Sequence, residues 1–177
     1  MFFSHTCSVM APNVRLTSQW IVNGEELIVK NMNICNKENI KKRILVSACL
    51  LGVNCKYDGG NNFSNEIDEF LKDYEVIPIC PEIMGGLPTP RCASEQLGDK
   101  VVTKEGIDVT EQFVKGANEC LFLAQKYDVK KALLKLRSPS CWYGKVYDGT
   151  FSHTLIERNR VTAELLKKNG IEIIAIK

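Results

Sequence analysis

The chain has 177 residues and a net charge of +2, and its composition is 45% hydrophobic and 25% charged. These values are ordinary for a soluble globular protein, and they exclude a strongly basic nucleic-acid surface and a disordered acidic tail. No apolar run approaches the roughly 18 residues of a membrane-spanning helix. The apolar start at Met1 lacks the basic segment and long apolar core of a signal peptide. We therefore expect a cytoplasmic protein that binds neither membranes nor, stably, nucleic acid.

Residues 1–42 differ in pattern from the rest of the chain. An Asn-Gly pair at 23–24 separates two apolar runs, which predicts a β-hairpin. A polar, basic stretch follows at 31–43. We interpret residues 1–42 as an N-terminal extension made of a possible hairpin and a linker, and residues 43–177 as the domain that carries function. We also hypothesise that Met32 is the natural start of the chain.

Apolar runs and helical periodicities alternate in the second part of the chain. The runs predict strands at 44–48, 75–79, 131–136 and 171–176. Between them we expect a short helix capped by Ser64, with Ile67, Phe70 and Leu71 on its apolar face, and a long helix after Asp108 or Thr110. A last helix covers 161–168 and stops at Gly170, and small hairpins or turns lie within 95–106 and 146–151. This alternation predicts a three-layer, Rossmann-like α/β domain with a mainly parallel sheet.

Two of the predicted strands run directly into Cys49 and Cys80, and a third leads into the turn at 138–141, which ends in Cys141. Ligands of open α/β sheets bind beyond the carboxyl ends of the strands, so we expect these thiols to converge. Disulfides are rare in the cytosol, which leaves three interpretations open. The thiols bind a metal or an iron–sulfur cluster, form a buried structural group, or act as a redox dithiol.

Two polar residues stand close to these cysteines in the sequence. Glu82 follows Cys80 across a proline that fixes its direction, and a carboxylate there can move a proton; the alternative is a solvated loop acid. Ser138 lies on the same tight turn as Cys141, where its hydroxyl can donate to a ligand or bond its own backbone.

Other loop residues complete the candidate site. Arg91 ends a loop rich in proline and glycine, and it is suited to an anionic or carbonyl group or to a surface ion pair. We also predict that Ser140 contacts a substrate. Cys55 and Cys92 are left as spare ligands or simple loop thiols.

The motifs of residues 43–177, taken in order, resemble those of a bacterial and archaeal domain-of-unknown-function family whose members are thiouracil desulfidases. The matching stretches are SACLLG at 47–52, YDGG at 57–60, CPE at 80–82, GGLPTPR at 85–91, SPSC at 138–141 and YDGTF at 147–151. Two stretches depart from the family pattern. Trp142 stands where a glycine usually follows the last cysteine, and residues 157–160 replace a more glycine-rich stretch.

The resemblance implies a [4Fe–4S] cluster held by Cys49, Cys80 and Cys141, in which one iron lacks a protein ligand and takes the substrate's sulfur. It implies Glu82 and Ser138 as catalytic residues. The implied reaction removes sulfur from 2- or 4-thiouracil by non-redox hydrolysis and releases hydrogen sulfide. The implied partners are a thiolated nucleobase and the iron–sulfur assembly machinery. The alternatives are a sulfur carrier that uses the same cluster, and a zinc or metal-free module that binds small ligands.

Overall fold

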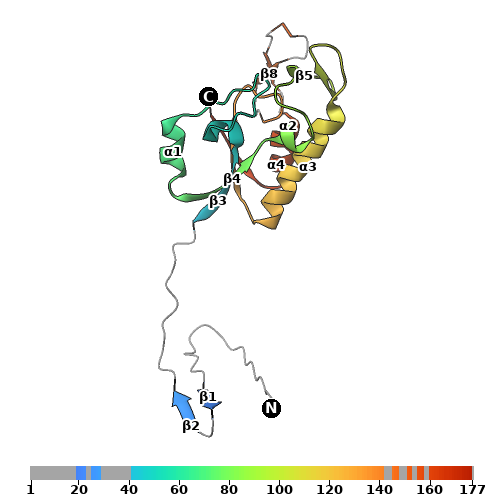
Figure 1. Ribbon diagram of the computed structural model, residues 1–177. Coiled ribbons are helices and arrows are strands. Elements are labelled where there is room, and N and C mark those ends of the chain that lie inside the picture. The colour runs from blue at the N-terminus through green and yellow to red at the C-terminus, as the bar shows by residue number, and fades with distance from the viewer. Residues whose placement is uncertain are drawn as a thin grey trace. The chain divides into compact units, whose positions relative to one another are not determined.

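The structure, a computed structural model, describes residues 19–22, 25–28, 41–141, 145–147, 151–152, 155–157 and 160–176. The chain divides into two compact units, Met1–Ile40 and Lys41–Lys177 (Figure 1). In the first unit, β1 (Gln19–Val22) pairs antiparallel with β2 (Glu25–Ile28). Met32, which we hypothesise to be the natural start, lies outside the described residues. The two compact units meet after Ile40, two residues before the boundary that the sequence predicts, and the first sheet pairing of the second unit is at Lys42.

The second unit is built on a four-stranded parallel sheet, as the sequence predicts. Its strand order is β10-β7-β3-β4. The strands are β3 (Lys42–Ser47), β4 (Tyr74–Ile79), β7 (Lys131–Lys135) and β10 (Glu172–Ile176). In the register, Leu45 of β3 lies opposite Ile77 of β4 and Ala132 of β7. Because all four strands run the same way, their carboxyl ends share one edge of the sheet.

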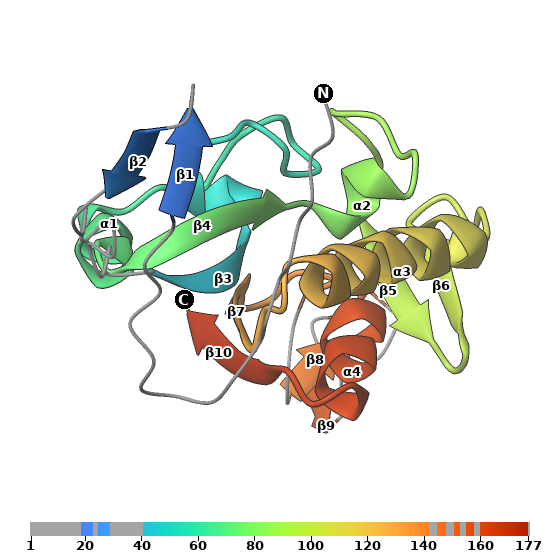
Figure 2. The ribbon, with the colours of Figure 1, turned by 90° about the horizontal axis from the view of Figure 1, so that it is seen from below.

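Helices cover both faces of this sheet and make the expected three layers (Figure 2). Side chains alternate along a strand, so Leu45 faces one layer while Ile44 and Val46 face the other. Helices α3 (Thr110–Lys126) and α4 (Val161–Lys168) pack on the Leu45 face. Helix α1 (Asn65–Leu71) packs on the opposite face with the 3-10 turn η1 (Ala48–Leu51).

Helix α1 begins where the sequence predicts. The Ser64 hydroxyl accepts a hydrogen bond from the Glu66 amide at 3.3 Å, which satisfies one free donor of the first turn. Ile67 and Leu71 are buried, but the prediction for Phe70 is wrong. That side chain is exposed and stacks on Tyr74 with ring centroids 5.6 Å apart, because the helix presents only a narrow stripe to the sheet.

The loop after β4 contains a helix that the sequence pattern does not predict. Cys80 is the N-cap of helix α2 (Pro81–Met84), and Pro81 takes its first position, where a missing amide hydrogen is tolerated. It packs backbone to backbone on α3. A Cβ atom added to Gly116 would lie 1.8 Å from the Pro81 carbonyl oxygen, so the contact requires glycine. This packing fixes where Cys80 and Glu82 stand.

Two antiparallel hairpins complete the unit. Strands β5 (Ser94–Leu97) and β6 (Lys100–Thr103) form the hairpin expected within 95–106. Strands β8 (Lys145–Tyr147) and β9 (Leu155–Glu157) form the other. The turn predicted around residues 148–149 lies outside the described residues. Within the described part of the chain, each helix is too short or too polar to cross a bilayer.

Candidate active site

A cavity of about 530 Å³ opens at the carboxyl edge of the parallel sheet. Its walls come from the loops that follow β3, β4 and β7, together with the β5 strand and Phe151. The polar and charged residues of its lining are Ser47, Cys49, Cys55, Lys56, Tyr57, Asn62, Cys80, Glu82, Arg91, Ser94, Glu95, Lys104, Lys135, Arg137, Ser138, Cys141 and Arg160.

The three predicted ligand thiols all line this cavity. Cys49 lies in the η1 turn after β3, Cys80 is the residue before α2, and Cys141 ends the turn after β7. Within the described residues, no three His, Cys, Asp or Glu side chains stand close enough to share one metal ion. An all-thiol set spread around a cavity suits an iron–sulfur cluster, in which separate irons take separate thiolates.

Hydrogen bonds favour the thiolate form of two of these cysteines. Hydrogen bonding with the Cys55 thiol, against the opposing effect of burial, lowers the pKa of Cys49 to about 6, and Asn62 and Lys135 act in the same direction. Hydrogen bonding with the same Cys55 thiol lowers the pKa of Cys80 to about 7, again against burial. These two thiols are prepared to bind a cation, because a thiolate is the form that ligates metal.

Cys141 has a different environment. Its side chain is buried, and burial raises the pKa of this thiol well above its ordinary value, while a hydrogen bond with Ser47 opposes the shift. The Ser47 hydroxyl also accepts the Lys135 amide at 3.1 Å, so it ties the end of β3 to the end of β7. Ser47 therefore holds two ligand-bearing strand ends in place.

Glu82 is a buried acid paired with Arg91. The Arg91 Nε and Nη2 atoms each lie 2.7 Å from Glu82 Oε2, and both side chains are almost fully buried. Burial raises the pKa of Glu82, although the adjacent guanidinium opposes the shift. Arg91 also donates to the carbonyls of Pro88 and Cys55 at 3.1 Å each. The solvated-acid interpretation of Glu82 is therefore wrong, and Arg91 is not a surface residue.

The two serines of the SPSC turn have different places. The Ser138 hydroxyl oxygen lines the cavity and accepts the amides of Ser140 at 3.3 Å and Cys141 at 3.1 Å. Ser140 is completely buried, and its hydroxyl lies 2.9 Å from that of Thr162. The prediction that Ser140 contacts substrate needs correction, since its hydroxyl is engaged behind the cavity wall.

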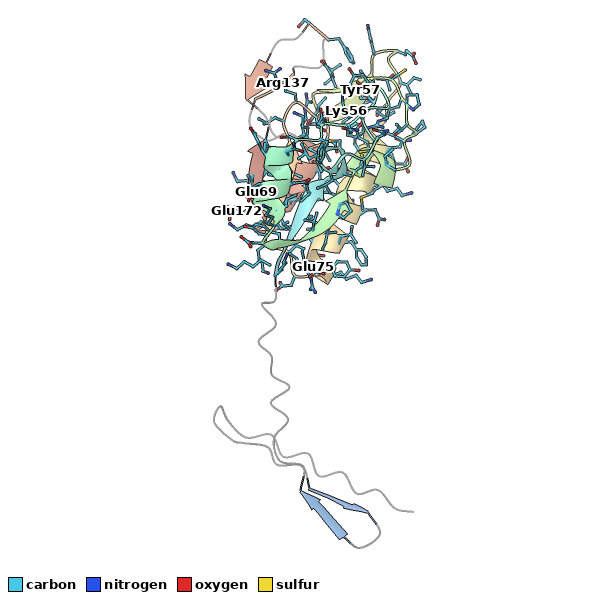
Figure 3. The ribbon with its side chains drawn as sticks, turned by 60° about the vertical axis from the view of Figure 1, so that its left-hand side comes forward. Lys56, Tyr57, Glu69, Glu75, Arg137 and Glu172 are labelled. Atoms are coloured by element: carbon cyan, nitrogen blue, oxygen red, sulfur yellow. The ribbon has the colours of Figure 1, made fainter. Side chains whose placement is uncertain are left out.

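Several site residues escaped sequence reasoning. Lys56 and Arg137 lie with Tyr57 at the end of the domain where the cavity opens (Figure 3), and all three line the cavity. Charge repulsion from Arg137 and Lys56 adds to burial in lowering the pKa of Lys135. No short-range pattern brings these residues together, because they come from loops after β3 and β7.

The fold and the site together define an α/β protein with a thiol-lined active site at the carboxyl edge of a parallel sheet. A family model described as 2-thiouracil desulfurase matches residues 44–177. The uncharacterized protein YbbK of Bacillus subtilis (strain 168) is 39% identical over 142 residues, which cover 75% of this chain and 94% of YbbK. The solved structure of the [4Fe-4S]-dependent thiouracil desulfidase TudS is similar with a TM-score of 0.72 and 41% identity, and the match covers 76% of this chain and 91% of that one. The chain belongs to the 2-thiouracil desulfurase family, as its motifs indicate.

Proposed function

We propose that this protein is a [4Fe–4S]-dependent thiouracil desulfidase, which removes sulfur from 2- or 4-thiouracil by hydrolysis and releases hydrogen sulfide. Cys49, Cys80 and Cys141 would hold the cluster and leave one iron without a protein ligand. One observation carries the proposal: thiols from the ends of three parallel strands line a single cavity together with a buried carboxyl group, Glu82. A cluster bound there would supply a Lewis acid that polarises a thiocarbonyl group.

Glu82 is the base of the proposed reaction. It lines the cavity, and burial raises the pKa of its carboxyl group toward the range in which a base works at neutral pH. Arg91 holds its Oε2 atom, which leaves Oε1 to accept a proton from water. The pair therefore fixes the orientation of the Glu82 carboxyl group at the cavity wall.

In the proposed reaction, Ser138 stabilises the turn that carries Cys141 and also contacts the substrate. Its oxygen already accepts two backbone amides, so its hydroxyl hydrogen is left to donate toward the cavity. Tyr57 and Phe151 also line the cavity, and their rings offer flat apolar surfaces to a planar base. This combination of thiol ligands, a general base and aromatic walls supports a thiolated nucleobase as the substrate.

The remaining parts of the proposal concern the setting of the enzyme. The six cysteines of the described residues are all free thiols, which fits the reducing cytoplasm. Its partners would be the thiolated base and the iron–sulfur assembly machinery, because a cubane cluster must be delivered to the folded thiols. Residues 43–177 would be the catalytic domain, and residues 1–42 an extension.

Purification under argon tests the proposal. We expect a brown protein with about four irons per chain that releases sulfide from both thiouracils over many turnovers. Changing Cys49, Cys80 or Cys141 to Ala should each remove the iron, whereas Cys120→Ala, in a buried thiol of the α3 core, should keep it. Cys7→Ala and Cys35→Ala should also keep it. A colourless zinc protein would refute the cluster, and a single turnover that leaves sulfide bound would indicate a sulfur carrier instead.

A further inference from the structure

Cys55 is a buried thiol that is neither a proposed cluster ligand nor a proposed catalytic residue. It is 6% exposed and lines the cavity beside Cys49 and Cys80. Its thiol is in hydrogen-bonding contact with the thiols of both residues. The Cys55 carbonyl oxygen lies 3.8 Å from Cys80 Sγ and 3.1 Å from Arg91 Nη2. Both the backbone and the sulfur of Cys55 are therefore fixed against two of the proposed cluster ligands.

The sulfur of Cys55 has different partners from those of Cys141 and Glu82. Its sulfur contacts are with Cys49 and Cys80, whereas the Cys141 thiol is bonded to Ser47 and the Glu82 carboxylate is held by Arg91. A thiol in this place flanks two of the proposed ligands. It is better placed to react with those two sulfurs than to take part in the attack on a substrate.

We propose that Cys55 is a resolving thiol, which closes a disulfide with Cys49 or Cys80 when the cluster is absent and the site meets hydrogen peroxide. The inference rests on the proposed function, because it takes Cys49 and Cys80 to be the cluster ligands. Peroxide oxidises one of these sulfurs by two electrons, forming a sulfenic acid and hydroxide. The Cys55 sulfur then attacks that sulfur, the S–S bond forms as the S–O bond breaks, and the thiol proton leaves with the oxygen as water.

The disulfide would protect the site from permanent damage. A sulfenic acid that finds no thiol is oxidised further to sulfinic and sulfonic acids, which thiol reductants do not reverse. A disulfide is reversed by thiol exchange and returns both cysteines to the thiol form. Loss of a cluster under oxidative conditions would then leave a protein that can be reloaded.

The test starts from the full-length protein with its cluster, whose iron content and sulfide release are measured first. Iron is removed with EDTA under argon, hydrogen peroxide is added, and free thiols are alkylated. Trypsin leaves Cys49 and Cys55 on one peptide, residues 44–56, so chymotrypsin is used to cut after Leu50 or Leu51. We expect peptides that link Cys55 to Cys49 or Cys80, which separate on reduction, and we expect reduced protein to regain its iron.

Cys55→Ser and Cys55→Ala should carry sulfinic acid on Cys49 or Cys80 after the same treatment, and they should fail to regain iron after reduction. Cys92→Ser is the matched control, because Cys92 is an exposed thiol on a neighbouring loop, and it should behave as wild type. Melting curves of the untreated variants check that they fold. An alkylated Cys55 after peroxide, a Cys49–Cys80 disulfide, or full recovery of iron in Cys55→Ser would each overturn the inference. Absence of iron or of sulfide release before any treatment would instead count against the proposed function.

Discussion

At the scale of single residues, the site depends on the carboxyl group of Glu82, whose pKa is shifted in opposite directions by two neighbouring effects. Burial of Glu82 favours its neutral form, and the guanidinium of Arg91 favours its charged form. Burial dominates, so the pKa of Glu82 is raised. A base of this kind loses its proton as the pH rises through the raised pKa, and we expect the rate of sulfide release to rise over the same range.

Glu82→Gln should keep the cluster and lose most turnover. The amide has the shape of the carboxyl group and still accepts a hydrogen bond from Arg91, so α2 should keep its place, but it cannot take a proton. General acid–base catalysis typically contributes about 10²–10⁴-fold, and we expect a loss of that size. Iron content, melting temperature and sulfide release are measured on one anaerobic preparation. Wild-type values of all three would remove Glu82 from the mechanism.

Arg91→Met should destabilise the protein, and more so at higher pH. Removing one partner of a buried ion pair typically costs about 3–5 kcal/mol, because the other charge is left uncompensated. The pKa of Glu82 would be raised further above its value in the unfolded chain. The contribution of Glu82 to the free energy of unfolding is then fully present below its pKa in the unfolded chain. It is lost as the pH rises through its higher pKa in the folded protein. The melting temperature of the variant is measured across the pH range that spans the unfolded and folded pKa values of Glu82.

The control for this change is Arg43→Met. Arg43 lies 2.7 Å from Glu75 in an ion pair that is about half exposed, and such pairs contribute only about 0–1 kcal/mol. An equal loss of stability in both variants, without pH dependence in Arg91→Met, would contradict the account of Glu82.

Ser138→Ala should weaken iron retention as well as turnover. The Ser138 hydroxyl accepts the amide of Cys141 at 3.1 Å, so its loss frees the turn that carries a proposed ligand. Supporting groups of this kind typically change metal affinity by about 10–100-fold. The rate of iron transfer to a chelator is measured under argon, and Ser138→Thr should restore it. If Ser138→Ala retains iron normally but loses turnover, Ser138 acts on the substrate and does not support the cluster.

At the scale of secondary structure, the contact between α2 and α3 sets the position of both Cys80 and Glu82. Gly116 of α3 lies directly under the Pro81 carbonyl, and Gly85 lies under the Gln112 carbonyl in the same way, with an added Cβ at 2.0 Å. Two glycines therefore let the backbones meet. A glycine inside a helix usually lowers stability, and here the close contact offsets that loss.

Gly116→Ala should destabilise the protein by about 1–3 kcal/mol, the usual range for overpacking, although alanine is the better helix former. It should also lower sulfide release by displacing Glu82. Lys115→Ala is the matched control, since Lys115 is exposed on the same helix and should leave both quantities unchanged. Melting temperature and turnover are measured together, and a stabilised Gly116→Ala protein would show that the two helices can move apart freely.

The outcome of the sequence predictions differs among the elements for physical reasons. The four sheet strands and helices α1, α3 and α4 follow apolar periodicities that local sequence carries. Ser64 caps α1 as predicted, but the N-cap of α3 is Val109 and not Asp108 or Thr110. Helix α2 is only four residues long and begins with Pro81, so its dense prolines and glycines resemble a rigid loop. Its helical form depends on packing against α3, which no local pattern records.

At the scale of the whole molecule, the presence of Cys49, Cys80 and Cys141 in one cavity could be predicted because it follows from sheet topology. The parts that could not be predicted depend on how loops return over the sheet edge. Cys55 reaches Cys49 and Cys80 through the path of the loop after η1, and Arg91 reaches Glu82 across the loop after α2. Neither contact can be predicted from the spacing of these residues in the sequence.

A chain that begins at Lys41, after an added Met, should fold and bind iron as the full chain does. The buried apolar clusters of the described residues begin at Ile44 and end at Ile171, all inside the second compact unit. Melting temperature and iron content of the shortened and full-length proteins are compared. A clear loss of either in the shortened protein would show that residues 1–40 support the domain.

The position of β7 in the sheet has a consequence for how the protein is made. This strand lies between β3 and β10, and β10 is the last of the four sheet strands in the sequence. Until Glu172–Ile176 has emerged, one edge of β7 is unpaired, and only its pairing with β3 places the strand that leads to Cys141. Cys49 and Cys80, by contrast, can be placed by the early pairing of β3 with β4. A nascent chain can therefore place Cys49 and Cys80 before it places the turn with Cys141, so we expect insertion of a cluster to follow the emergence of β10.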